Sequence, residues 1–472
     1  MRTKKTYLGP KLRQLRKDAG QTQMEMAQAL GLSTSYVNLL ENNQRSLSVQ
    51  VLMRVSEVYG VEWRDLVQDD TPNKLADLRN VLQDPVFEGS RPDLQELRAS
   101  LDHCPQLAES VLGLHKAYRA LMERALTART VDGAGPRQVF TASPEAAVHD
   151  LFRRNRNHFP ALESAAESFF DGGRAEADEI YAYLKNRLTT GLGIEVETVA
   201  AADLPDTLRF YDQAGSKVLL SEVLDFPNRI FQLTHMLALL EYGEAIDALI
   251  ESAGVTDLRQ QARCRVELAN YLAAAVLMPY AAFLAEARAS KYDLDHLAAR
   301  FGVSFEQVCH RVTTLQREGA QGVPFFFLRV DKAGNVTKRF NATSFHLADH
   351  GGSCPRWDLH LSFRTPGRIM PQFVELPDGQ RYFTINRTVD RPNSNYQAQD
   401  NRLAVALGCS IEHAGSLIYA EPFQLGAPDL FTPIGINCRL CPRQACAQRA
   451  HQPLHLDLPI DENRRGQTRF ES

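Results

Sequence analysis

Three cysteines near the C-terminus have a spacing that suits metal chemistry. They lie in the run GINCRLCPRQACAQRA as Cys438, Cys441 and Cys446, so three thiols fall within nine residues. Thiolates bind zinc or iron–sulfur clusters, and a fourth ligand is needed to complete either site. We predict Cys409 as that ligand, with Cys354 as the alternative. Two other interpretations stay open, namely reduced cysteines packed as small apolar side chains and a redox-reactive thiol cluster without metal.

A second place with metal-ligand residue types lies in the middle of the chain. The runs NRIFQLTHMLALLE (228–241) and RVELANYLAAAVLMP (265–279) resemble the ImmA/IrrE zinc-peptidase-like family. That family carries H-E-x-x-H on one helix, where two His hold zinc and the Glu is the general base. Here Met236 replaces the acid and Leu239 replaces the second ligand, which leaves His235 and a distant Glu267. One imidazole cannot complete a tetrahedral site, so we predict no enzymatic activity and a packed His235.

The N-terminal segment is basic and carries helix signals. Residues 1–66 hold ten Lys or Arg against six Asp or Glu, which gives +4 and leaves −8 for the remaining chain. Thr22 and Glu25 form a capping-box pattern, Gly31 is a helix stop, and Ser33 is the next cap. Two short helices joined by a Gly-containing turn are typical of a helix-turn-helix, whose second helix enters the major groove.

Residues 8–67 resemble the Cro/C1-type, or XRE, helix-turn-helix family. The run QTQMEMAQALGLSTSYVNLLENNQR and the closing VYGVEWRDLV carry the resemblance. It implies a head that binds double-stranded operator DNA, in which polar side chains of the second helix face base edges and arginines contact phosphates. The predicted DNA-contacting residues are Arg13, Gln23, Thr34, Ser35, Asn38 and Arg45.

The whole-chain composition is that of a soluble multidomain protein. A length of 472 residues, with 44% hydrophobic and 23% charged residues, predicts about three domains. The N-terminus has no apolar signal region, and the most apolar stretch, 271–285, is too short to cross a bilayer. We therefore expect a cytoplasmic protein without membrane contact, whose eight cysteines do not serve as disulfides.

The predicted fold class is multidomain and mainly α, with an α+β C-terminal region after the helix-turn-helix bundle. Helical spacing of Leu112, His115, Tyr118, Met122 and Leu126 favours a coiled-coil dimer arm over a connecting bundle. Strands are expected near 209–220 and at 324–340, 359–363, 372–376 and 381–385, and a helix-turn-helix-like pair at 294–316 is expected in the core. The predicted domains are 1–70 (DNA-binding), 71–145 (linker or dimerisation arm), 146–320 (degenerate peptidase-like) and 321–472 (α+β sensor with the cysteines).

From end to end the chain resembles the short-chain fatty acyl transcriptional regulators. The carrying features are the head, the HMLAL helix, GGSCPRWDLH (351–360) and NCRLCPRQACAQRA (437–450). The resemblance implies a transcription factor that responds to short-chain acyl-CoA and controls propionate or acetate assimilation. It also implies a [4Fe-4S] cluster, as in PrpR-like members, with zinc as the alternative.

Coenzyme A needs clustered cations beside an apolar tunnel, because it joins a phosphorylated nucleotide to a narrow apolar tail. The candidate cations are Arg153, Arg154, Arg156, Arg356, Arg364 and Arg368. We expect a homodimer, since two operator half-sites need two heads. Two alternative functions remain: a zinc-dependent peptidase regulator with ligands beyond His235, and a redox- or metal-sensing regulator for which acyl-CoA is irrelevant.

Overall fold

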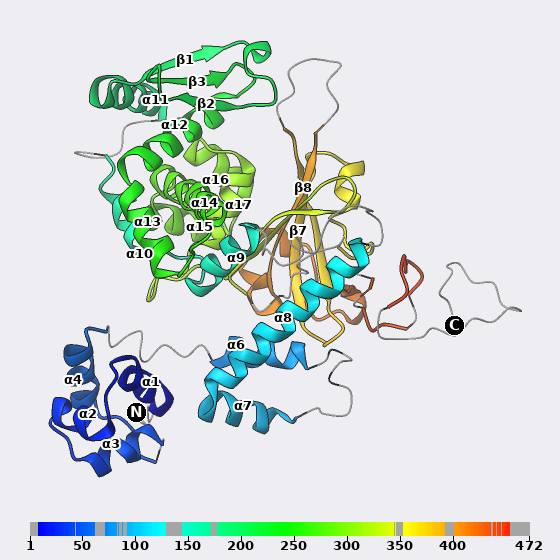
Figure 1. Cartoon of the computed structure of the whole chain (residues 1–472). Helices are drawn as coiled ribbons and strands as arrows, with labels where there is room; N and C mark the ends of the chain where they lie inside the picture. The colour runs from blue at the N-terminus through cyan, green and yellow to red at the C-terminus, as the bar shows by residue number, and fades with distance from the viewer. Residues whose placement is uncertain are drawn as a thin grey trace, which may run out of the picture. The chain divides into compact units, whose positions relative to one another are not determined.

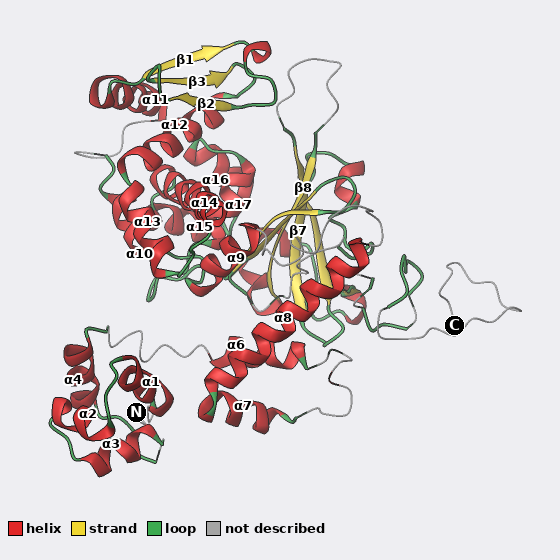
Figure 2. Ribbon diagram, viewed as in Figure 1, coloured by secondary structure: helices red, strands yellow, loops and turns green. Residues whose placement is uncertain are grey.

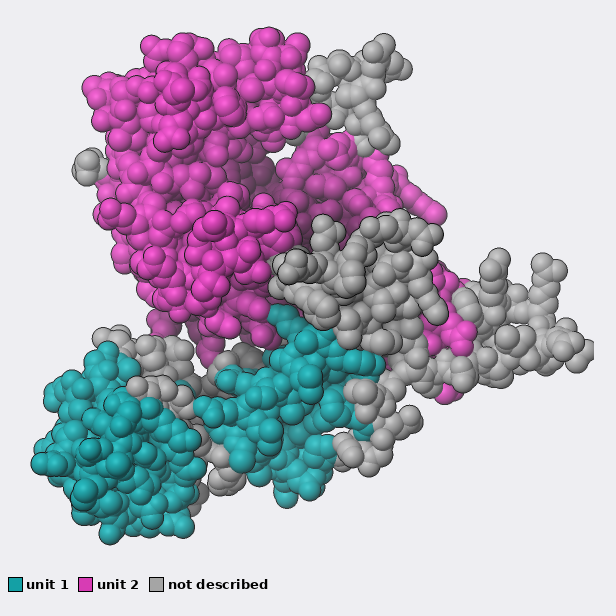
Figure 3. Space-filling model, in the orientation of Figure 1, with its two compact units in different colours: residues 1–139 teal, residues 140–472 magenta. Residues whose placement is uncertain are grey.

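The computed structural model describes most of the chain in two compact units, 1–139 and 140–472 (Figures 1 and 3). The described residues are 8–42, 44–61, 71–82, 84, 87, 92–128, 144–170, 177–343, 345, 353–391, 401–435, 438–439, 441–444 and 446–453.

Four short helices form the first part of the N-terminal unit. They are α1 (Gly9–Asp18), α2 (Gln23–Leu30), α3 (Thr34–Glu41) and α4 (Val49–Tyr59). The predicted capping box is confirmed, because Thr22 accepts a hydrogen bond from the Glu25 backbone and the Glu25 side chain accepts one from Thr22. Gly31 ends α2 in the left-handed conformation, and the Ser33 side chain caps α3. One apolar cluster joins the four helices, with Met26, Leu40 and Val55 almost fully buried.

Three further helices complete this unit: α6 (Thr71–Val81), α7 (Leu94–His103) and α8 (Pro105–Ala128). Their core consists of Leu78, Leu97, Leu101 and Ala108. Two members of the predicted dimer stripe serve this bundle, since Leu112 packs on its core and His115 contacts Asp84 at 3.0 Å. Leu107 and Leu114 lie on an exposed face of α8. The side chains of Met122 and Leu126 lie outside the described residues.

The C-terminal unit begins with a helical part arranged around one long helix. Helix α14 (Leu258–Leu277) packs against five other helices and is almost continuously buried from Glu267 onward (Figure 1). A three-stranded sheet of order β1-β3-β2 confirms the strands expected near 209–220. The helices are α9 (Pro144–Arg154), α10 (Pro160–Glu167), α11 (Ala177–Asn186), α12 (Phe226–Glu241), α13 (Gly243–Ser252), α14, α15 (Tyr280–Ala289), α16 (Leu294–Phe301) and α17 (Phe305–Thr313), and the strands are β1 (Glu195–Val199), β2 (Arg209–Asp212) and β3 (Lys217–Ser221).

A six-stranded sheet of order β5-β4-β8-β7-β6-β9 follows. Its strands β7 and β8 are drawn in yellow and labelled in Figure 2. The strands expected at 324–340, 372–376 and 381–385 are confirmed and form two hairpins, but the strand expected at 359–363 is wrong. That segment forms a 3-10 turn at Leu361–Arg364, because the His360 and Ser362 amides bond to carbonyls three and four residues back. The strands are β4 (Phe326–Val330), β5 (Val336–Asn341), β6 (Met370–Glu375), β7 (Arg381–Val389), β8 (Leu403–Ser410) and β9 (Thr432–Pro433).

One hydrophobic core joins the helices to one face of this sheet. Phe327, Phe340, Phe383 and Leu407 belong to the same buried cluster as Leu237 and Leu272 of the helical part. The predicted boundary between 320 and 321 therefore falls within a single compact unit, and the pair α16–α17 packs in its core as expected. Among the described residues no single helix is long and apolar enough to cross a membrane; α14 and α15 pass that test only as a pair bent by 69°.

Candidate DNA interface, cysteine cavity and ligand pocket

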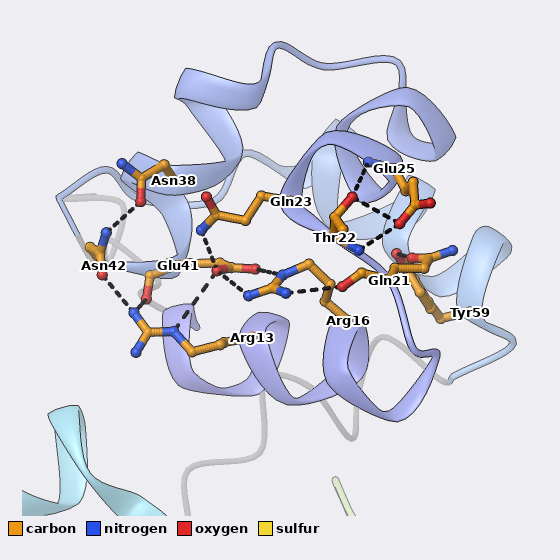
Figure 4. A network of polar contacts seen from close by, with 10 residues as sticks. All are labelled: Arg13, Arg16, Gln21, Thr22, Gln23, Glu25, Asn38, Glu41, Asn42 and Tyr59. Carbon is orange, nitrogen blue, oxygen red and sulfur yellow. Dashed lines mark hydrogen bonds and ion pairs between the residues drawn. The ribbon is translucent and has the colours of Figure 1, made fainter.

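A buried carboxylate organises the helix-turn-helix. Glu41, at the end of α3, is 2% exposed and accepts hydrogen bonds from Arg16 Nε at 2.6 Å and Gln23 Nε2 at 2.8 Å (Figure 4). Burial disfavours its charged form, but the bonds from Arg16 and Gln23 prevail and lower the pKa of Glu41. Arg13 joins the network through the Glu41 carbonyl oxygen at 3.3 Å and Asn42 Oδ1 at 2.6 Å. The network ties α1, α2 and α3 together.

Helix α3 presents a polar face to the outside. Thr34, Ser35 and Asn38 are exposed, whereas Val37 and Leu40 on the other face are buried. The Asn38 side chain accepts a hydrogen bond from Asn42 at 2.7 Å (Figure 4). A short helix with small polar side chains near its N-terminus suits contact with base edges in a major groove.

The residues predicted to be the remnant of a peptidase site, called here the peptidase remnant, lie on α12 and α14. Arg209 donates a hydrogen bond to His235 Nδ1 at 2.8 Å, so Nε2 carries the proton and donates to the Val266 carbonyl at 3.2 Å. Burial and then the Arg209 charge lower the pKa of His235 to about 4. His235 is 4% exposed, which confirms that it is a packed helix residue. Both of its ring nitrogens are committed to protein partners.

The acid of this remnant is committed as well. Glu267 Oε2 lies 3.0 Å from Lys338 Nζ of β5, and Glu267 Oε1 lies 3.1 Å from the Arg263 guanidinium. Burial disfavours the Glu267 carboxylate, but Lys338 and Arg263 lower its pKa. Two cations therefore hold the carboxylate that a zinc site would need.

Four thiols line one small cavity in the C-terminal part of the same unit. Cys354, Cys438, Cys441 and Cys446 line a space of about 300 Å³, part of it open to solvent, together with arginine side chains. Cys409 is not among them: it is fully buried in β8 opposite Phe383, and burial raises its pKa to about 12. The structure therefore brings the alternative ligand, Cys354, to the three clustered cysteines instead of Cys409. Burial, and then the nearby Cys438 and Cys441 thiols, raise the pKa of Cys354.

Arginines border this cysteine cavity. Arg449 donates hydrogen bonds to the backbone carbonyls of Cys438 at 3.2 Å and Cys441 at 3.4 Å, and also bonds the Arg443 carbonyl. Arg443 in turn donates to the Glu375 carbonyl of β6 at 2.9 Å. The thiols are not assembled at ligation distance, since no group of three or more His, Cys, Asp or Glu side chains in the described part is close enough to hold a metal ion. The donor set itself, four thiols beside cations, fits a thiolate-bound centre.

A larger pocket, called here the inner pocket, lies among α9, α12, α14, α17 and β5. It has a volume of about 430 Å³, part of it open to solvent. Its apolar wall comes from Phe152, Phe231, Ala274 and Phe340, and its polar wall from α14 and α17.

Comparisons with known proteins decide the family. Three family models match: a helix-turn-helix at 12–66, an IrrE N-terminal-like domain at 190–313, and the C-terminal domain of the short-chain fatty acyl coenzyme A regulators at 314–470. The propionyl-CoA carboxylase regulator of Cereibacter sphaeroides is 38% identical over 99% of both chains. The chain belongs to the short-chain fatty acyl-CoA regulators. It is a helix-turn-helix transcriptional regulator.

Two Mycobacterium tuberculosis members of this family match over nearly their full length. RamB is 38% identical over 98% of this chain and 97% of its own, and PrpR is 36% identical over 97% and 94%. A solved M. tuberculosis transcriptional regulator superposes with a TM-score of 0.65 at 36% identity, covering 70% of this chain and 100% of that one. The resemblance seen in the sequence is therefore confirmed.

Within this regulator, the predicted DNA-contacting residues divide into two groups. Thr34, Ser35 and Asn38 are exposed on α3, and Arg45 is exposed just after it, with its guanidinium 5.8 Å from the Tyr36 ring centre. Arg13 and Gln23 are instead directed toward Glu41, which sequence reasoning missed. The sequence did contain a signal for the burial of Glu41, because Val37, Leu40 and Glu41 share the helical spacing of a buried face. A buried acid there requires cationic partners.

The six predicted coenzyme A arginines lie on separate segments of the regulator. Three exposed ones, Arg153, Arg154 and Arg156, follow directly after Phe152 of the inner pocket, at the end of α9. Arg356 borders the cysteine cavity. The exposed pair that remains, Arg364 and Arg368, lies in and after the 3-10 turn. None of the six lines the inner pocket itself.

Proposed function

We propose that this regulator binds operator DNA as a cytoplasmic homodimer and changes its operator affinity when it binds a short-chain acyl-CoA. In this way it controls propionate or acetate assimilation. The observation that carries the proposal is end-to-end similarity to a relative named as a propionyl-CoA carboxylase regulator, together with a C-terminal match to a model named for short-chain fatty acyl coenzyme A. The exposed face of α3 supports the DNA-binding half.

A ligand can change operator affinity only if it binds two conformations unequally. The inner pocket offers a place for such coupling, because Phe152 comes from the helical part and Phe340 from the six-stranded sheet. A molecule held between these two walls favours one arrangement of them over another.

The test is operator binding by fluorescence anisotropy at fixed salt, using promoter DNA from propionate-assimilation genes with and without propionyl-CoA. We expect a five- to 150-fold change in Kd, the usual range of allosteric coupling. The Asn38→Ala variant, which retains the fold but loses a predicted base contact, is the control for sequence-specific binding. An unchanged Kd, with ligand binding shown independently, would contradict the proposal.

The homodimer is supported by the exposed face of α8 and by the requirement of two-fold operators for two heads. Leu107 is 61% exposed and Leu114 72% exposed, seven residues apart on the same face of that helix. Light scattering of the full chain measures the mass directly. A mass of one chain at micromolar concentration would contradict this part of the proposal.

For the cysteine cavity we favour a [4Fe-4S] cluster held by Cys354, Cys438, Cys441 and Cys446, with zinc as the alternative. When bound, such a cluster supplies one-electron redox chemistry. The residues support the assignment, since four thiols face one cavity and Arg356, Arg443 and Arg449 border it, where they offset thiolate charge. Anaerobic purification followed by visible absorption and by iron and zinc analysis separates cluster, zinc and bare thiols.

The same cysteine cavity favours a second candidate function, a redox- or metal-sensing regulator. In that case oxidation or metal removal changes operator affinity and acyl-CoA has no effect. Titrating operator binding against oxidant and against propionyl-CoA in parallel distinguishes the two functions.

A further inference from the structure

Arg13, Asn42 and Asn38 form a short series of hydrogen bonds, called here the amide relay, which ends on the exposed face of α3 (Figure 4). Arg13 of α1 donates to Asn42 Oδ1 at 2.6 Å, and Asn42 Nδ2 donates to Asn38 Oδ1 at 2.7 Å. Two contacts with Glu41 hold the Arg13 guanidinium in place: it donates to the Glu41 carbonyl at 3.3 Å, and its Nε lies 3.8 Å from the buried carboxylate. The amide relay therefore connects a fixed cation on α1 to a side chain that we predict to contact a base.

The guanidinium decides which way both amides point. An arginine side chain donates hydrogen bonds and accepts none, whereas an amide donates through its nitrogen and accepts through its oxygen. Asn42 must therefore present its oxygen to Arg13, and this turns its NH2 group toward Asn38. Asn38 must accept with its own oxygen, because two NH2 groups cannot bond to each other. One cation thus fixes the orientation of two exposed amides.

This orientation leaves Asn38 with a hydrogen-bond donor at its free end. Its Nδ2 makes no hydrogen bond within the part of the chain that the structure describes, and it is directed away from Asn42 (Figure 4). Asparagine commonly pairs with adenine through both ends, because its oxygen accepts from N6 while its nitrogen donates to N7. Here the oxygen is already bound to Asn42, so the two-bond contact with adenine is disfavoured and the donor remains.

We propose that Arg13 and Asn42 are positioning residues that make Asn38 select guanine over adenine at one position of the operator. Guanine presents two neighbouring acceptors in the major groove, N7 and O6, and no donor, so its edge matches an NH2 group. Adenine and cytosine each place an amino group on that edge, which meets the Asn38 donor without a bond. This inference rests on the DNA-binding half of the proposed function and adds to it the base that α3 reads.

The first experiment selects DNA from a library of random duplexes with the full-length protein and with the Asn38→Ala variant. The position at which Asn38→Ala loses its base preference is the one that Asn38 reads, and we expect a G·C pair there in the wild-type selection. Replacing that guanine by 7-deazaguanine, which lacks the N7 acceptor, should weaken wild-type binding about tenfold and leave Asn38→Ala unaffected.

The outcomes of this experiment separate the inference from the function on which it rests. Another base pair at that position, no effect of 7-deazaguanine, or no position that responds to Asn38→Ala overturns the inference. Failure of the wild-type protein to select any sequence overturns the proposed function instead.

The second experiment reverses the amide relay. In Asn42→Asp the carboxylate still accepts from Arg13 but cannot donate to Asn38, so Asn38 turns its NH2 group inward and presents its oxygen. We expect the preference to move by about tenfold from guanine to adenine or cytosine, whose amino groups donate. The added negative charge weakens binding to every sequence alike, so the base preference is the readout. Asn42→Ala adds no charge and frees the Asn38 amide, so it should bind guanine and adenine operators equally. If both variants keep the guanine preference, the proposal is wrong.

The third experiment removes the cation that begins the amide relay. Arg13→Leu leaves both amides free to turn, so the preference for guanine over adenine should disappear. The matched control is Lys17→Leu, which removes the same charge from an exposed position on the same helix. Both variants should bind all DNA more weakly, but only Arg13→Leu should lose the base preference. If Arg13→Leu keeps the preference as the control does, Arg13 does not act through the amides and the proposal falls.

Discussion

The peptidase remnant and the cysteine cavity both contain residue types that bind metals. In the remnant these side chains are already bound to protein partners, whereas in the cysteine cavity the thiols face a shared space. In the remnant, His235 uses both ring nitrogens and Glu267 uses both oxygens on protein partners. In the cysteine cavity, four thiols face a shared space and the arginines around them bond to backbone carbonyls instead. We therefore expect metal binding to depend on uncommitted donor atoms more than on residue type.

The metal content of the cysteine cavity is the most direct test of this difference between the two sites. Cys441→Ser removes one of four thiols, and we expect iron or zinc content per chain to fall to near zero, because three protein ligands hold a thiolate centre poorly. Metal analysis after anaerobic purification measures this. The exposed Cys104 in the other unit is the matched control, and Cys104→Ser should retain full metal content. Equal metal in the two variants would contradict the assignment.

The remnant makes the opposite prediction, that its charges serve stability without any metal. Glu267→Ala leaves Lys338 and Arg263 without their buried partner and should cost about 3–5 kcal/mol in the free energy of unfolding. The control is Glu421→Ala, which removes an ion pair between two exposed side chains, Glu421 and Lys291, and should cost about 0–1 kcal/mol. Urea unfolding with and without zinc measures both. A cost that appears only with zinc present would mean that the remnant is a metal site.

The pH dependence of stability tests whether His235 is held uncharged in the folded protein. Its pKa is about 4 in the folded protein against about 6.5 in an unfolded chain, so protonation favours unfolding. Stability should be complete above about pH 6.5 and fall as the pH drops toward 4, by about 3 kcal/mol. His235→Gln should lose that part of the dependence in urea titrations at several pH values. An unaltered slope would show that the imidazole is not held neutral by Arg209 and burial.

Local signals in the sequence were sufficient for most elements of the fold. The caps at Thr22 and Ser33 and the left-handed Gly31 confine α2 and α3 within a few residues, so their bounds follow from short-range bonds. Strand β8 gave no such signal, because the central strand LAVALGCS is buried on both faces and lacks alternation. The segment at 359–363 has strand-like composition but folds on itself through local turns.

The sites depended on contacts between residues distant in the sequence, which spacing does not reveal. The chain places Cys354 in the cavity with Cys438 across more than 80 residues, while Cys409, closer in sequence, is part of the sheet core. Likewise Glu41 accepts hydrogen bonds from Arg13 and Gln23, which lie 28 and 18 residues before it. No periodicity predicts which of two candidate cysteines, or which arginine, completes such a pairing.

The smallest effect that we expect is on metal affinity, from the hydrogen bonds of Arg449 to the backbone segment that carries Cys438 and Cys441. Arg449 is 5% exposed and donates to the carbonyls of Cys438 and Cys441, so it holds the backbone that carries two of the thiols. Arg449→Lys keeps the charge but cannot span both carbonyls, and loss of such support costs about ten- to 100-fold in metal affinity. Competition with a chelator measures this. Arg263→Lys in the remnant should leave metal affinity unchanged, because we expect no metal to bind there. If the two variants behave alike, the guanidinium of Arg449 acts through charge alone and the loop needs no such support.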